Sequence, residues 1–179
     1  MTLDREERQV VLRDPVDTDS QVHFSFPPVA EIVRMYGGET TNLPRPDLDR
    51  SKRWLSWFRD HPFAKIIVFN GEAVGHVRLH SLEKTDRRAR LAIGLFAVSH
   101  LGKGIGRRAI RLTLDYAFGP MELHRIDLRV LSYNTRAIRC YTSCGFVHEG
   151  TEREAAWIHG AWHDDWIMGI LSGEHDATF

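Results

Sequence analysis

The sequence predicts an α/β (α+β) protein in which a single mixed, mostly antiparallel central sheet carries helices on both faces. Three observations support this. Residues 89–118 read as an apolar strand, a glycine-rich turn and an amphipathic helix, and a strand at 124–131 completes a β–α–β crossover. Asn70-Gly71 between two apolar runs is a hairpin signal. The chain has 179 residues, 42% of them hydrophobic, so we expect residues 1–179 to form a single domain.

Composition excludes several classes of protein. The 24 Lys and Arg balance the 24 Asp and Glu, so no net field favours nucleic acid or a membrane surface. No apolar run has the length of a membrane span, and the N-terminal MTLDREERQ is too polar for a secretory signal, so we expect a cytoplasmic location. Cys140 and Cys144 are expected to be buried free thiols. Ten histidines are present without an HExxH or a paired CxxC pattern, so no metal is expected.

The N-terminal third alternates short elements with turns. A strand is expected at 8–13 and a turn at 14–19, and the pattern does not define the helix that follows the turn. Pro27-Pro28 open a helix that continues through Tyr36 and closes at Gly37-Gly38. A loop with two prolines at 39–49 comes next.

Ser51 is the expected N-cap of the following helix, which ends before His61-Pro62. Trp54 and its aromatic neighbours on this helix belong either to the core, the commoner case, or to the wall of a substrate site.

Strands are then expected at 65–70 and 73–81. Period-two alternation places Val74, His76, Arg78 and His80 on one face of the second strand. Two histidines and an arginine on one strand face suggest a cleft, and an exposed sheet face is the equally compatible alternative.

The turn after the strand at 89–98 holds glycines at 102, 104 and 106 and leads into a helix. Glycine permits close backbone approach, and the free N–H groups of a first helical turn bind anions. Basic residues gather at this helix start although the helix dipole disfavours them there. A polyphosphate ligand would neutralise them; a tight turn with solvated basic residues is the alternative. These residues are Lys103, Arg107, Arg108 and Arg111.

The C-terminal third continues the pattern of short elements. Gly119-Pro120 end the long helix, and Asn134 caps a helix running to Cys144, with Gly145 as its terminator. Further strands are expected at 146–150, 153–160 and 162–171, followed by a frayed tail from Ser172.

Two motifs at this separation resemble the GNAT superfamily of acyl-CoA-dependent N-acyltransferases. They read HLGKGIGRRAI at 100–110 and NTRAIRCYTSCGF at 134–146, followed by EG. The run at 125–154, with Asp165 after it, is most similar to the branch that holds ribosomal-protein N-terminal and polyamine acetyltransferases. The resemblance covers nearly the whole chain and is strongest at 93–150. It implies a splayed pair of strands and acetyl transfer from acetyl-CoA to a primary amine by direct attack in a ternary complex.

The resemblance also implies roles for individual residues. Tyr141 stands where relatives meet the coenzyme sulfur and would protonate the leaving thiolate, and the Val98 N–H would polarise the thioester carbonyl. A core tyrosine is the alternative for Tyr141. The implied contacts to coenzyme A are Phe96, Ala97, Val98, Leu101, Gly102, Lys103, Gly104, Ile105, Gly106, Arg107, Asn134 and Arg139.

Two positions depart from the family pattern. Leu101 stands where relatives commonly carry Arg or Gln, which implies a weaker phosphate contact. Ala92 stands where relatives in this branch often carry a glutamate that accepts a proton. His76 and His80 are the candidate bases in its place, because a neutral imidazole accepts a proton near neutral pH. An amine of low pKa loses its proton with less assistance from a base, so Ala92 favours such amines as the expected substrate. The candidate substrate contacts are Trp54, Arg78, His80 and Trp157.

Two other functions compete with acyl transfer. Ala92 favours a non-catalytic acyl-CoA sensor on the same fold, whereas a dinucleotide site is weak because Arg107 stands where its third glycine belongs. A protein N-terminus, a polyamine, an aminoglycoside-like antibiotic and a small amine metabolite all remain open as the acceptor. The acidic residues that would favour a cationic acceptor, or that form ordinary surface, are Glu39, Asp47, Asp49 and Asp60. The chain is expected to act as a monomer or homodimer.

Overall fold

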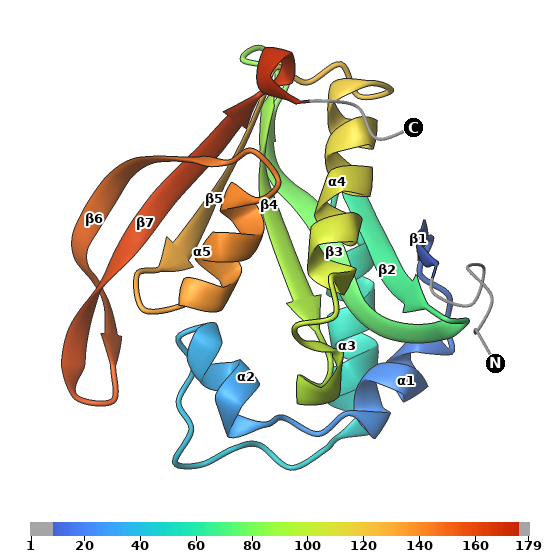
Figure 1. Ribbon diagram of the computed structural model, residues 1–179. Coiled ribbons are helices and arrows are strands. Elements are labelled where there is room, and N and C mark those ends of the chain that lie inside the picture. Colours follow the sequence, from blue (N-terminus) through green and yellow to red (C-terminus); the bar gives the residue numbers. More distant parts are fainter. Residues whose placement is uncertain (1–8, 176–179) are drawn as a thin grey trace, which may run out of the picture.

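A computed structural model describes residues 9–175 (Figure 1). A seven-stranded sheet has the order β1-β2-β3-β4-β5-β7-β6, and every neighbouring pair is antiparallel except β4 and β5. The strands are β1 Val10–Arg13, β2 Phe63–Phe69, β3 Glu72–Glu83, β4 Arg88–Leu95, β5 Arg125–Leu131, β6 Val147–Ile158 and β7 Ala161–Leu171. The helices are α1 Asp19–Ser25, α2 Ala30–Met35, α3 Leu48–Arg59, α4 Ile105–Phe118 and α5 Thr135–Thr142.

The parallel pair β4 and β5 is splayed. Their register runs only from Arg88↔Arg125 to Arg90↔Asp127. Beyond Arg90 the C-terminal half of β4 keeps its pairing with β3 but has none with β5. Figure 1 shows the two strands diverging, with α5 in front of the opening. The predicted sheet with a splayed pair is confirmed.

Helices cover both faces of the sheet. On one face, α4 buries Ile110 and Leu114 against the apolar side of the central strands, and α5 adds Tyr141 to the same cluster. On the other face, α3 buries Phe58 against Ile66 of β2. The helices α3, α4 and α5 are amphipathic and bury part of their apolar side, as a layered fold requires. None of the helices within residues 9–175 is long and apolar enough to cross a bilayer.

Two element boundaries differ from the prediction by three residues or more. The cap of α3 is Asp47, whose side chain accepts a hydrogen bond from the Asp49 N–H at 2.9 Å; Ser51 lies inside the helix and is buried. Aspartate caps as well as serine does, and the earlier residue begins the helix. The strand expected to reach Val98 ends at Leu95, because a 3-10 turn at Val98–His100 follows.

The pattern on two strands is broken by irregular pairing. A register shift between Ile67 and Val68 turns Val74 into the core beside Val77, so Val74 does not share a face with His76. The strands expected at 146–150 and 153–160 form one strand, β6, with register shifts between His148 and Gly150 and between Glu152 and Ala156, the second of which begins at the predicted break. Bulges insert residues without ending a strand, which sequence alternation cannot distinguish from a turn.

The chain ends are described only in part. Arg8 of the predicted first strand and the N-terminal segment through that residue lie outside the described residues. The predicted frayed tail is wrong for Ser172–Glu174, which form a 3-10 turn. The Ser172 N–H donates to the His124 carbonyl at 2.9 Å and holds that turn against β5.

Candidate active site

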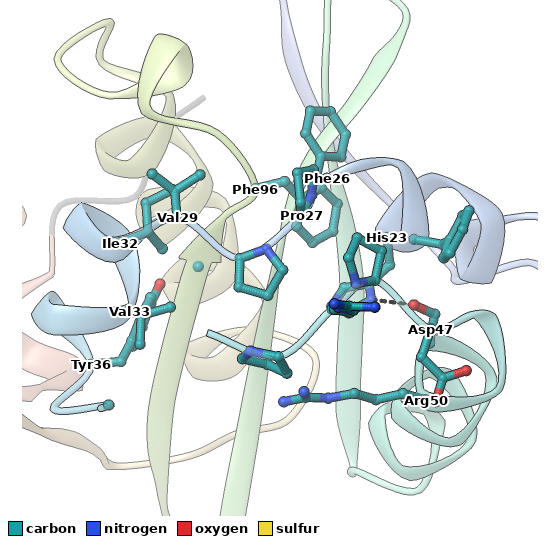
Figure 2. A pocket seen from close by; sticks show the side chains of 18 of the residues that line it. His23, Phe26, Pro27, Val29, Ile32, Val33, Tyr36, Asp47, Arg50 and Phe96 are labelled. Atoms are coloured by element: carbon teal, nitrogen blue, oxygen red, sulfur yellow. Dashed lines mark hydrogen bonds between the residues drawn. The ribbon is translucent and has the colours of Figure 1, made fainter. Parts of the chain in front are cut away.

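Two cavities open on either side of the C-terminal end of β4. The first, here called the glycine-loop cavity, has a volume of about 480 Å³ and lies between α2, β4, the 100–107 segment and α5. The second, here called the aromatic cavity, has a volume of about 410 Å³ and is lined by α1, α2, the start of α3 and the loop before it (Figure 2). The residues common to both linings are Ile32, Tyr36, Gly94 and Leu95. The two cavities therefore meet where β4 leaves β5.

The glycine turn has the backbone that an anion site needs. Gly102 and Gly104 have φ of +74° and +79°, and Gly104 is the N-cap of α4. No described atom lies within 4 Å of a Cβ built on either glycine, so the turn is open to a ligand. The first-turn N–H groups of α4 and the side chains of Arg107 and Arg139 border the same cavity. This part of the site fits a diphosphate.

The structure places some residues of the predicted coenzyme site in the glycine-loop cavity, one in the aromatic cavity and others in neither. The lining of the glycine-loop cavity includes Leu101, Gly102, Gly104, Ile105, Gly106, Arg107, Asn134, Arg139 and Tyr141. Phe96 lines the aromatic cavity instead. Ala97, Val98 and the exposed Lys103 line neither cavity.

Backbone groups on the edge of β4 that faces away from β3 border the opening of the splay. The Ile93 carbonyl accepts a hydrogen bond from the Tyr36 hydroxyl at 2.9 Å, whereas the Phe96 N–H donates to Val74 of β3 at 2.9 Å. Alternate residues of a strand direct their N–H and C=O groups to opposite edges. The N–H groups of Ile93 and Leu95 therefore point away from β3, into the opening, where they can donate to a ligand.

Two tyrosines flank this opening. Tyr141 is buried, packs edge-on against Phe146 with ring centroids 5.9 Å apart, and lines the glycine-loop cavity. Burial raises the pKa of the Tyr141 phenol, so it keeps its proton throughout the neutral range. The Tyr36 side chain is 61% exposed, yet its hydroxyl is enclosed against Gly94. Desolvation of that hydroxyl raises the pKa of Tyr36 to about 12.

Asn134 has the predicted capping role. Its side-chain oxygen accepts from the Ala137 N–H at 3.1 Å, which confirms it as the N-cap of α5. Its amide also donates to the Met35 carbonyl at 3.1 Å. Asn134 therefore ties α2 to α5 across the glycine-loop cavity.

Two histidines reach the aromatic cavity. His23 of α1 stacks on Trp54 at 4.1 Å, and its Nδ1 is 2.9 Å from the Ser51 hydroxyl. Burial and the nearby Arg50 lower the pKa of His23. Burial, with a smaller contribution from Arg78, lowers the pKa of His76 to about 3. Both imidazoles are therefore neutral at pH 7.

Gly94 leaves space for two polar groups at the junction. A Cβ on this residue would lie 2.7 Å from the Tyr36 hydroxyl and 2.9 Å from His76 Nε2. No group within residues 9–175 bonds the buried His76 Nδ1. Only glycine at this position lets a phenol and an imidazole converge on the strand where the two cavities join.

The remaining predicted residues lie outside both linings. His80 is hydrogen-bonded to the neighbouring Ser81 hydroxyl at 3.0 Å, and Trp54 stands behind His23. The Arg78 guanidinium lies over the Trp57 ring at 4.7 Å. Trp157 is 59% exposed on β6, with its ring 5.0 Å from that of Trp162.

Sequence reasoning missed three residues of the aromatic cavity, His23, Tyr36 and Arg50. They come from two helices and a helix start that do not form a contiguous motif. Tyr36 had one available signal, its position directly before the Gly37-Gly38 helix stop. Within residues 9–175, no three His, Cys, Asp or Glu side chains are grouped to hold a metal ion.

Comparisons with known proteins identify relatives. Residues 29–146 match the model of the acetyltransferase (GNAT) family. The spermidine N(1)-acetyltransferase of Vibrio cholerae is 37% identical over 102 residues, 57% of this chain and 58% of that enzyme, so the chain spans less than two thirds of its length. An aminoglycoside N(6')-acetyltransferase type 1 of Klebsiella pneumoniae is 28% identical over 152 residues, 79% of this chain and 76% of the relative.

A solved structure is similar over almost the whole length. It is the crystal structure of the spermidine N-acetyltransferase from Vibrio cholerae in complex with CoA and spermine. The two chains are 28% identical and superpose with a TM-score of 0.77 over 93% of this chain and 97% of that one. The predicted resemblance, and with it the predicted fold, are confirmed.

Proposed function

The chain belongs to the acetyltransferase (GNAT) family, and we propose that it transfers an acetyl group from acetyl-CoA to the primary amine of a small molecule. The observation that carries this proposal is the meeting of two cavities at the splayed end of β4. One cavity has the open glycine turn and arginines that a diphosphate requires. The other is a separate, largely apolar chamber that reaches the same strand from the opposite side.

The glycine-loop cavity would hold the coenzyme. The diphosphate would bind the N–H groups of the 102–107 segment, with Arg107 and Arg139 adding charge. The pantetheine arm would follow the free edge of β4 at Ile93 and Leu95. When bound, acetyl-CoA supplies an activated acyl carbon as a thioester.

The chain's own groups would support direct transfer. The amine nitrogen bonds to the acyl carbon, the carbon–sulfur bond breaks, the sulfur leaves as a thiol and the amine loses one proton. We assign carbonyl polarisation to the Leu95 N–H, which faces the opening, in place of the Val98 N–H, which lies in the following turn. Tyr141 is the proton donor to sulfur, since its phenol is protonated and faces the cavity.

We assign removal of the amine proton to the histidines that line the aromatic cavity. His76 Nε2 faces Gly94 and would orient the nitrogen through a hydrogen bond. An imidazole with a pKa of about 3 is a weak base, so His76 suits an amine that arrives already neutral. His23 is the better final proton acceptor, and His80 lies outside the cavity.

The same proposal extends to the whole chain. We propose residues 1–179 as one N-acyltransferase domain that acts in the cytoplasm as a monomer or homodimer, without nucleic acid or membrane partners. The single sheet of residues 9–175 and the balanced charge support this.

The test combines binding and turnover. Calorimetry with acetyl-CoA is expected to give a saturable heat, and a panel of primary amines is expected to give acyl-dependent release of thiol. Binding without release for every amine would favour the acyl-CoA sensor. No binding at all would overturn the whole assignment.

A further inference from the structure

The charges around the aromatic cavity differ in how far they are already engaged. Its two acidic residues are Glu39 and Asp47. Glu39 accepts hydrogen bonds from the Thr40 and Thr41 N–H groups at 2.8 and 3.0 Å. Asp47 caps α3 and lies 3.7 Å from Arg53. Both carboxylates keep their negative charge, but each already has hydrogen-bond or ion-pair partners within the protein.

The basic residues of the cavity are not engaged in this way. Arg45 and Arg50 line it, and the described part of the chain places no carboxylate within ion-pair distance of either guanidinium. Figure 2 shows the Arg50 side chain extending from α3 across the cavity toward the α2 side. Burial lowers the pKa of the His23 imidazole, and the positive charge of Arg50 lowers it further. Arg45 and Arg50 are therefore the basic side chains of the lining that have no ion-pair partner among the described residues.

The position of the two arginines determines how an acceptor molecule would be oriented in the aromatic cavity. The transfer point is the junction formed by Tyr36 and Gly94, and neither arginine belongs to the residues common to both cavities. The apolar part of the cavity wall includes Phe26, Val33 and Phe96. The neutral His23 and His76 add no negative charge to attract a second ammonium group.

We infer that the acceptor is a primary amine joined through an apolar or aromatic body to an anionic group, with the amine at Gly94 and the anion at Arg50. This inference rests on the proposed acetyl transfer and narrows its substrate. A polyamine would bring a second cation toward the two unpaired arginines, whereas a carboxylate would form charge-assisted hydrogen bonds with them.

The experiment compares 4-(aminomethyl)benzoate with 4-(aminomethyl)benzamide and spermidine, with saturating acetyl-CoA and thiol release as the readout. The benzoate and benzamide share the ring and the amine and differ in the negative charge. We expect kcat/KM for the benzoate to exceed that for the benzamide by about tenfold or more, as one charge-assisted contact provides, and to exceed that for spermidine further.

Arg50→Glu is expected to reverse the ratio of benzoate to spermidine use, while Arg50→Gln removes the preference over the benzamide. Lys52→Gln, which removes a positive charge from the exposed side of the same helix, is the matched control and should keep both ratios. Equal use of benzoate and benzamide, or a preference for spermidine that survives Arg50→Glu, would overturn the inference while leaving acetyl transfer intact. Coenzyme binding without turnover of any amine would instead overturn the proposed function, and the inference with it.

Discussion

The two cavities that meet at Gly94 are built in different ways. The glycine-loop cavity takes most of its lining from two sequence segments, β4 with the turn and helix start after it, and α5. The aromatic cavity is assembled from α1, α2, a proline-rich loop, the start of α3 and single residues of β3 and β4. The first side is centred on the strand–turn–helix segment from β4 to α4, whereas the second is assembled from several separated segments. Changes on the first side should affect the coenzyme, and changes on the second the acceptor.

The largest expected effect tests the chemistry of the glycine-loop side. Tyr141→Phe removes the proton donor to the leaving sulfur and should lower kcat by about 10²–10⁴-fold, the usual contribution of general acid catalysis. The ring still fills its place against Phe146, so the Kd for CoA should change little. Steady-state kinetics together with calorimetry separate the two effects. Equal kcat in the variant and the parent would remove the assigned role.

A substitution at the junction should affect both sides together. Gly94→Ala places a methyl group where the Tyr36 hydroxyl and His76 Nε2 now converge. A displacement of about 1 Å at a reacting centre costs about 10²-fold in rate, and we expect a loss of that size in kcat/KM. Gly150→Ala is the control, because a Cβ there meets no described atom within 4 Å. Full activity of Gly94→Ala would show that acetyl transfer does not take place beside this residue.

A smaller effect is expected from the turn alone. Gly104→Ala puts an L-residue at φ +79°, which costs about 1–2 kcal/mol and shifts the N–H groups that face the diphosphate. The Kd for CoA should rise by about tenfold, measured by calorimetry. Gly160→Ala in the β6–β7 turn has a similar φ of +78° and should leave that Kd unchanged. Equal CoA affinity in both variants would show that the turn does not grip the coenzyme.

The last expected effect is a change in the pH dependence of stability, which arises from His76 on the aromatic side. The pKa of His76 falls from 6.5 to about 3 on folding, so the unfolded chain binds a proton that the folded chain does not. The stability that neutral His76 permits is present above pH 6.5 and is lost progressively as the pH falls toward 3. Its contribution to the slope of unfolding free energy is at most about 1.4 kcal/mol per pH unit. Urea unfolding of His76→Gln between pH 7 and 5 should show a shallower slope than the parent, and identical slopes would contradict this.

Much of the molecule was predictable because its determinants are local. The glycine turn, the α4 stripe and the Asn134 cap each depend on residues a few positions apart, and the structure has each of them. Predictions of the face of a strand on which a residue lies were less reliable. The register shift beside Val68 turned Val74 into the core although it alternates with His76 in the sequence.

By itself, the sequence determined the layered fold, the β4–α4–β5 crossover and the turn suited to a diphosphate. Local backbone preferences and short-range periodicity carry that information. Only the tertiary structure decided that Tyr36 and His76 converge on Gly94, that Phe96 faces the aromatic cavity, and that Arg50 is unpaired while Glu39 and Asp47 are engaged. These relations join segments far apart in the chain, and their distances depend on how the helices pack on the two faces of the sheet.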